Sequence, residues 1–217
     1  MRLLNQRIAQ RSNREDEQTG SFWQDRFRLT KLIDEESLLA CMVYVDLNPV
    51  RAAMAETLER SDFTSVQRRI QGERQAAAVA GICSDTGTKS KRRDAFLAKL
   101  TIDPIQDPVG PSPSKTPARC SDKGVLELPT HASLELADWT ARQIAPGKRG
   151  CTPDNTPPVL QRLGLEPKCW CELMDHFVDA FIHLAGRSDR VDAARSHQTG
   201  RRFRVRPLAR TLLPSAA

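Results

Sequence analysis

The clearest hydrophobic pattern in the chain lies in residues 34–56. Apolar side chains recur there at the spacing of one helix face: Leu38, Cys41, Met42 and Val45. Asp34 precedes this run and is a good N-cap, since its carboxylate can accept a hydrogen bond from a free N–H of the first turn. The pair Asn48-Pro49 predicts a break, because a residue before proline is pushed out of the α region. We therefore predict a helix over 34–47 and a second helix over 49–57.

The pattern after residue 125 predicts a small helical region over 126–186. Its apolar positions favour one helix over 133–144 and another over 157–163 that stops at Gly164. A longer helix is expected from Pro167 to Gly186, with its aromatic residues in the core. The basic stretch 187–217 is interpreted as a disordered tail with non-specific affinity for nucleic acid.

The stretch 72–125 is interpreted as a flexible linker. Residues 101–120 contain five prolines with serines and threonines, and such a composition leaves little apolar surface to bury. With the linker placed there, the chain divides into four predicted parts: 1–71, 72–125, 126–186 and 187–217.

Residues 22–29 alternate as a short strand would. Trp23 and Phe27 fall on one face, and Arg26 and Arg28 fall on the other. Two neighbouring guanidinium groups suit phosphate, because each planar fork can bind two oxygens at once. The fold class that these patterns predict is predominantly α with one or two short strands.

Composition narrows the choice of partner and compartment. The formal net charge of the 217 residues is +6, which suits a polyanion but is also common in other proteins. No run of residues approaches the length of a membrane span, and the N-terminus lacks an apolar signal core. We therefore expect a cytoplasmic protein with no membrane partner.

The six cysteines show no disulfide pattern and are interpreted as free thiols. Cys169 and Cys171, followed by His176 and His183, admit a zinc site as an alternative to ordinary packing. Tetrahedral zinc sites usually space two cysteines by two to four residues, which favours packing here. We predict no metal site in this chain.

Tyr44 is the only tyrosine of the chain and lies off the predicted apolar stripe. Its neighbours one turn away are Ala40, Cys41 and Asn48, none of them bulky, so a phenol there can reach a group outside the helix. The alternative is a half-buried core tyrosine whose hydroxyl meets a carbonyl.

Three runs in this part of the chain resemble a known family. FWQDRF (22–27), YVDLNPVRA (44–52) and SDFTSVQRRI (61–70) are similar, in this order, to the C-terminal part of the REP-associated tyrosine transposases, which are single-tyrosine HUH transposases. The resemblance covers roughly residues 1–71, and a tail of long family members is similar to residues 123–165. It implies that the first 71 residues are the C-terminal remnant of an α+β HUH-type domain.

The chain departs from the family at the metal site. The family holds a divalent metal with a His–apolar–His strand upstream of the tyrosine, but no histidine precedes His131 here and no H-x-H occurs. The resemblance therefore implies a family member that lacks its N-terminal half. Magnesium or manganese is expected in complete members, and no cofactor is expected in this chain.

The resemblance also implies roles for particular residues. Tyr44 matches the nucleophile that cleaves single-stranded DNA and holds a 5′-phosphotyrosine. Asn48 and Arg51 are expected to support it, since Arg51 would lie in the first turn of the second helix, beside N–H groups that receive a phosphate. The resemblance favours a DNA contact for Arg26 and Arg28, and simple surface charge is the alternative. The implied partner is single-stranded DNA hairpins, with a homodimer as a further expectation; the alternative is a non-catalytic nucleic-acid-binding or interaction module.

Overall fold

The computed structural model describes residues 2–23, 29–81, 92–105, 107, 112–115, 117–143, 156–196 and 205–215. The chain divides into two compact units, residues 1–30 and 31–217. In the described residues, eight α-helices and two strands of two residues each form the regular structure. This confirms the prediction of a predominantly α protein with one or two short strands. Within the same residues, no helix combines the length and the apolar character that a membrane crossing requires.

The first unit holds helix α1 (Arg2–Glu15) and the residues that follow it. The indole Nε1 of Trp23 donates a hydrogen bond to the carbonyl of Asn5, 3.0 Å away, and the Phe22 ring meets the Trp23 ring edge-on. Phe22 and Trp23 are not part of a strand. Leu29 is not part of a strand either, and residues 24–28, with Arg26 and Arg28, lie outside the described residues.

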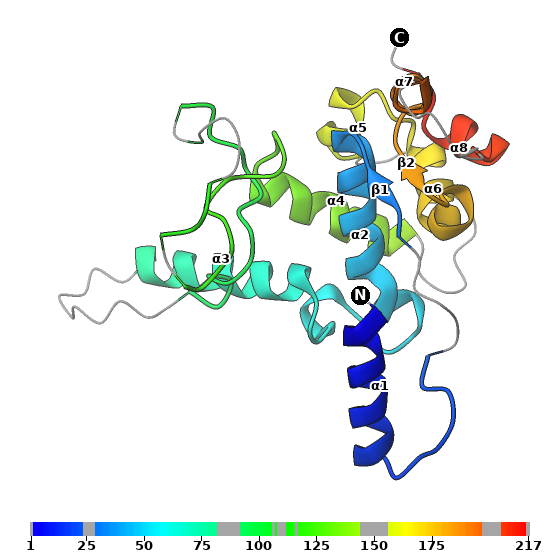
Figure 1. The fold of residues 1–217 in the computed structure, drawn as a ribbon. Helices are drawn as coiled ribbons and strands as arrows, with labels where there is room; N and C mark the ends of the chain where they lie inside the picture. Colours follow the sequence, from blue (N-terminus) through cyan, green and yellow to red (C-terminus); the bar gives the residue numbers. More distant parts are fainter. Residues whose placement is uncertain are drawn as a thin grey trace. The chain divides into compact units, whose positions relative to one another are not determined.

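The second unit begins with a short parallel pairing of β1 (Lys31–Leu32) and β2 (Leu184–Ala185), which lie side by side in Figure 1. Gly186 follows β2 at a position where no side chain fits: a Cβ there would lie 2.5 Å from Ile33 Cγ1. This close approach brings the segment around Ile33 and the segment around Gly186 together, just before the helix that begins at Glu35.

Helix α2 (Glu35–Arg51) is continuous, so the predicted break at Asn48-Pro49 is wrong. Asp34 is its N-cap, as predicted, and its carboxylate accepts a 2.9 Å hydrogen bond from Ser37 N. Pro49 lies in the last turn, where burial of Leu47 and Val50 offsets the steric cost of a helical residue before proline.

The buried face of α2 also differs from the predicted stripe. The side chains that enter the core are Leu39, Ala40, Val43, Leu47 and Val50. Val45 of the predicted stripe is 54% exposed, and the other three members are half-buried. The helix therefore carries two apolar faces. Packing against α4 (Thr130–Gln143) and α6 (Pro167–Ala180) buries the face that contains Leu39, and not the predicted one.

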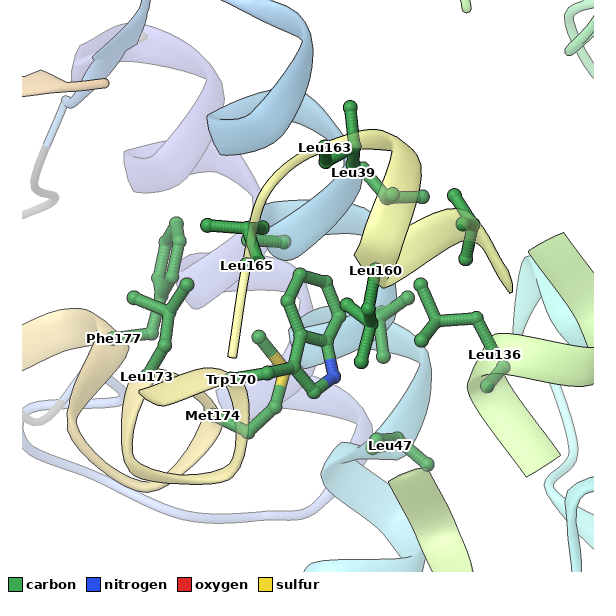
Figure 2. Close-up of a cluster of buried hydrophobic side chains, with 14 of the residues drawn as sticks. Leu39, Leu47, Leu136, Leu160, Leu163, Leu165, Trp170, Leu173, Met174 and Phe177 are labelled. Atoms are coloured by element: carbon green, nitrogen blue, oxygen red, sulfur yellow. The ribbon is translucent and has the colours of Figure 1, made fainter. Parts of the chain in front are cut away.

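Trp170 of α6 is at the centre of the core (Figure 2). Its indole Nε1 donates to Thr140 Oγ1 at 3.0 Å, and that hydroxyl donates to the carbonyl of Leu136 at 2.6 Å. The relay leaves no unpaired polar group at this point and fixes α6 against α4.

The predicted helices 133–144 and 157–163 are present as α4 and as α5 (Pro158–Arg162). Gly164 follows α5 with φ of +59°, a conformation that favours glycine at a helix C-terminus. Helix α6 begins at Pro167 as predicted but ends at Ala180, because the chain extends from Phe181 towards β2.

Parts of the predicted linker are structured. Helix α3 (Ser65–Gly81), preceded by the 3-10 turn η1 (Leu58–Arg60), runs across the predicted boundary at residue 71. Leu100 is buried, and its carbonyl accepts hydrogen bonds from Val125 N and Leu126 N. Backbone hydrogen bonds therefore join the two ends of the proline-rich stretch. Composition alone does not predict this pairing.

The segment predicted as a disordered tail contains α7 (Ser188–Ser196) and α8 (Pro207–Leu212). Leu212 and Leu213 are fully buried, and α8 packs on α6. Arg210 pairs with Asp192 of α7 at 2.7 Å. In the described residues 187–196 and 205–215 the basic composition is compatible with order, because the arginines have partners and Leu212 and Leu213 enter the core. Arg201, Arg202 and Arg204 lie outside the described residues.

Arg187 joins three of these elements from a buried position. Its Nε donates to Glu36 Oε1 at 2.7 Å, and its terminal nitrogens donate to the carbonyls of Leu163 and Pro214. Its backbone N donates to Asp34 Oδ2 at 2.6 Å. One residue thus holds the start of α2, the end of α5 and the end of α8.

We expect Arg187→Met to lower the free energy of unfolding by about 3–5 kcal/mol, because it leaves the Glu36 carboxylate partly buried without its cation and frees two carbonyls. Chemical denaturation followed by circular dichroism measures the change. The matched control is Arg190→Met on α7, whose side chain is mostly exposed and should change stability by less than about 0.5 kcal/mol. Equal effects of the two substitutions would contradict the assigned role of Arg187.

Candidate functional site around Tyr44

Tyr44 lies in the middle of α2, on the side that faces α6. Its ring stacks on the ring of Phe177, with 5.2 Å between centroids and 24° between planes. The guanidinium carbon of Arg51 lies 5.2 Å from the centroid of the tyrosine ring. The ring is therefore held by an aromatic contact from α6 and a cation–π contact from its own helix.

This environment agrees with the core interpretation in the burial of the ring and differs from it in the partner of the hydroxyl. The side chain does not stand clear of the fold, since it is half-buried against the core. Its hydroxyl also makes no hydrogen bond within the described residues, although the core interpretation expected a carbonyl partner. The ring is therefore fixed, and its hydroxyl has no hydrogen-bond partner in the part of the chain that the structure describes.

Arg51 is in the last turn of α2, and not in the first turn of a second helix as predicted. Its Nη1 donates to the carbonyl of Met174 at 2.5 Å, and its Nη2 lies 3.4 Å from the carbonyl of Asp175 and 3.6 Å from the Asp175 carboxylate. These groups lie beside His176, whose φ of −118° and ψ of 16° interrupt the helical geometry of α6. The guanidinium thus provides donors for carbonyls at an irregular point of α6.

The correction removes the reason for placing a phosphate at Arg51. The last turn of a helix presents carbonyl oxygens, which repel an anion, and the first turn presents N–H groups. Internal acceptors also occupy part of the Arg51 fork. A DNA contact at Arg51 would therefore compete with its contacts to α6.

The remaining predicted site residues are in different situations. Asn48 is exposed and lies one helical turn after Tyr44, so both are on the same side of α2. Arg26 and Arg28 are outside the described residues. The structure therefore brings together Tyr44, Asn48 and Arg51, and leaves the two other arginines as a sequence-based expectation.

Asp46 is a residue of the same motif that sequence reasoning left without a role. It is buried, and its carboxylate accepts a 2.9 Å hydrogen bond from Ser65 N and a 2.7 Å hydrogen bond from the Ser65 hydroxyl. Both bonds are made at the first residue of α3. Asp46 therefore acts as a cap from a distant part of the chain, which no local sequence signal reveals.

Phe177 was also missed as a site residue. It was expected in the core of the last long helix, and it is buried there. Its contact with Tyr44 depends on how α2 and α6 pack, so a sequence pattern within either helix does not disclose it.

No group of three or more His, Cys, Asp or Glu side chains that could hold a metal ion occurs in the described residues. Cys169 and Cys171 are half-buried and are not part of a disulfide. Burial, with the nearby Glu166 and Glu172 carboxylates, raises the pKa of Cys169 and so favours the protonated form, which is a poor metal ligand. The donor set around α2 and α6 thus does not fit the metal of the resembling family.

Comparisons with family models, with curated proteins and with solved structures find no match for this chain. The assignment of a function therefore depends on the resemblance of the three sequence runs and on the geometry around Tyr44.

We expect Tyr44→Phe to change the free energy of unfolding by less than about 0.5 kcal/mol, because the hydroxyl has no hydrogen-bond partner in the described residues. Tyr44→Ala should cost about 2 kcal/mol, because it removes the contacts with Phe177 and Arg51 from a half-buried position. Denaturant titration of the two variants beside the unmodified chain measures both changes. A similar loss in both variants would show that the hydroxyl is bonded within the fold.

Proposed function

We propose that this chain is a relative of the single-tyrosine HUH transposases and that Tyr44 is the residue that attacks single-stranded DNA. The observation that supports the proposal is the state of Tyr44 on α2: its ring is fixed by Phe177 and Arg51, and its hydroxyl is uncommitted within the described residues. A nucleophile requires both features, since it must be positioned and must have a free lone pair.

The reaction follows from the chemistry of a phenol and a phosphodiester. The Tyr44 oxygen forms a bond to phosphorus while the bond from phosphorus to the 3′-oxygen breaks. The phenol releases its proton and the leaving 3′-oxygen takes one up, so the products are a 5′-phosphotyrosine and a DNA strand with a free 3′-hydroxyl. Joining is the reverse attack by a 3′-hydroxyl, and it releases the tyrosine. A divalent metal supplies charge stabilisation in the resembling family, but the described residues of this chain offer no ligand set for it.

DNA binding would use the positive charge of the chain. The net charge of +6 favours a polyanion, and Arg26, Arg28 and Asn48 are the residues we assign to it, with Arg51 available only if it releases α6. We propose single-stranded hairpins as the DNA and the cytoplasm as the compartment, with a homodimer as the assembly.

A second candidate is a non-catalytic nucleic-acid-binding or interaction module. The contact of Tyr44 with Phe177 and Arg51 favours it, because the same contact also ties α2 to α6 as part of the packing. In that case, the ring stabilises the fold and the hydroxyl has no chemical role.

A covalent-adduct assay separates the two candidates. We expect the chain with magnesium or manganese and a single-stranded hairpin to form no adduct, because metal assistance is worth several kcal/mol and each ~1.4 kcal/mol is tenfold in rate. Fusion of an H-x-H-bearing segment from a complete family member should produce an adduct visible as a shift on a denaturing gel.

The control for the assay is Tyr44→Phe in the fusion protein, which should abolish the adduct without changing stability. An adduct that survives this substitution would exclude Tyr44 as the nucleophile. A fusion that forms no adduct, although it binds the hairpin, would favour the non-catalytic module. Efficient reaction of the unmodified chain would show that the chain itself holds the metal.

DNA binding is expected to weaken steeply with salt, and Arg26→Ala with Arg28→Ala should reduce that dependence. Loss of two phosphate contacts lowers the slope of log K against log salt by about 1.4 for a single strand. Fluorescence anisotropy over a series of salt concentrations measures the slope. The control is Arg60→Ala with Arg74→Ala, which removes the same charge from exposed positions that we do not assign to DNA. A slope equal in both double variants would contradict the assignment.

A further inference from the structure

A cavity of about 760 Å³ lies between α3 and two segments of the stretch that sequence composition assigns to a linker. Its described walls come from α3, from residues 92–101 and from residues 117–119, with Thr130 at the start of α4. The volume is within the range of sites that hold small organic ligands. None of the residues assigned to the Tyr44 site lines it.

Arg69 of α3 is the most unusual group in the cavity wall. Only 9% of the residue is exposed, and its Nη2 donates a 2.9 Å hydrogen bond to the carbonyl of Ala98. Its Nε is buried without a hydrogen-bond partner. No carboxylate lies within ion-pair distance of it among the described residues. A buried cation with an unpaired donor is costly unless another group supplies negative charge and an acceptor.

The pKa of Arg69 also indicates that its charge is incompletely compensated. Burial lowers the pKa of Arg69, and the charges of Asp46 and Asp94 only partly oppose that effect. The Asp46 carboxylate already accepts hydrogen bonds at the start of α3. The protein thus supplies Arg69 with distant negative charge and with a single carbonyl.

The other charges of the wall are largely paired. Arg92 contacts both carboxylates of the wall, Asp94 at 2.9 Å and Glu73 at 3.4 Å. Arg119 pairs with Asp122, which is not part of the wall. Lys99 adds an ammonium group that acts on Asp107 from the edge of the cavity. After these pairings one carboxylate charge remains beside Arg92, and Arg69 and Lys99 are the two cations of the wall that form no ion pair within the described residues, so the net charge of the wall is positive.

We propose that this cavity binds a small phosphate-bearing molecule, with Arg69 and Lys99 as the groups that neutralise the phosphate. The guanidinium group of Arg69 has donors left over to meet phosphate oxygens, and Lys99 supplies a second positive charge from a separate segment. A dianion suits two cations better than a carboxylate does. The space beyond a phosphate group is sufficient for a nucleoside.

Binding can be tested on the full chain with inorganic phosphate and with adenosine monophosphate as the two probes. At constant ionic strength, each should raise the melting temperature in a saturable way, and calorimetry should give a finite dissociation constant. Arg69→Met and Lys99→Gln should each weaken binding roughly tenfold or more, because each removes a charge-assisted contact. The control is Arg74→Gln, which removes an exposed arginine of the same helix that pairs with Glu59 outside the wall.

The two probes distinguish the source of the phosphate. Tighter binding of the nucleotide, with the same dependence on Arg69, assigns the site to a nucleoside phosphate; equal binding assigns it to free phosphate. Non-saturable or absent binding of both probes would overturn the proposal, as would equal binding of acetate or an unchanged affinity in Lys99→Gln. The Lys99 variant decides the matter even if Arg69→Met does not fold, because Lys99 is exposed.

Discussion

The buried guanidinium of Arg187 is the constraint on which the arrangement of the second unit depends. A cation that is only 8% exposed must be matched on every side, and here Glu36 supplies the charge while the carbonyls of Leu163 and Pro214 supply further acceptors. These partners are at three helix ends, so the charge is satisfied only when all three ends are in place. The backbone N of the same residue binds Asp34, which also caps α2. The start of the helix that carries Tyr44 is therefore fixed by the C-terminal third of the chain.

The motif around Tyr44 has a second structural role besides the catalytic one that the resemblance implies. Asp46 caps α3, Arg51 bonds the carbonyls of α6, and the Tyr44 ring stacks on Phe177. Each of these contacts would by itself explain why that residue type occurs at that position. Packing gives no reason for the Tyr44 hydroxyl within the described residues, since a phenylalanine would stack equally well. The chemical proposal rests on that atom.

Local signals predicted the elements whose ends are determined by their own residues. Pro167 starts α6 and Gly164 follows α5, because proline fits the first turn of a helix and glycine fits the left-handed conformation after it. Asp34 caps α2 for the same kind of reason. These features are decided within a few residues, and a single sequence contains them.

The predictions that were wrong concern features that depend on contacts with distant parts of the chain. Helix α2 has two apolar faces with helical spacing, and only its packing on α4 and α6 selects the buried one. Pro49 remains in the helix because Leu47 and Val50 are buried beside it. The C-terminal segment is helical where Leu212 meets the core and Arg210 meets Asp192, and none of these partners is visible in its basic composition.

The arginines show why net charge is a weak guide to function in this chain. Arg187 and Arg51 donate hydrogen bonds to carbonyls and carboxylates within the fold. They therefore add to the net charge of the chain but have few donors left for a ligand. Arg69 is as buried as Arg187, yet its Nε has no acceptor within the described residues. The difference lies in how completely the surrounding backbone satisfies each guanidinium, and not in how many there are. A binding site is therefore better sought at the arginine that the fold leaves unsatisfied than at the segment where arginines are most frequent.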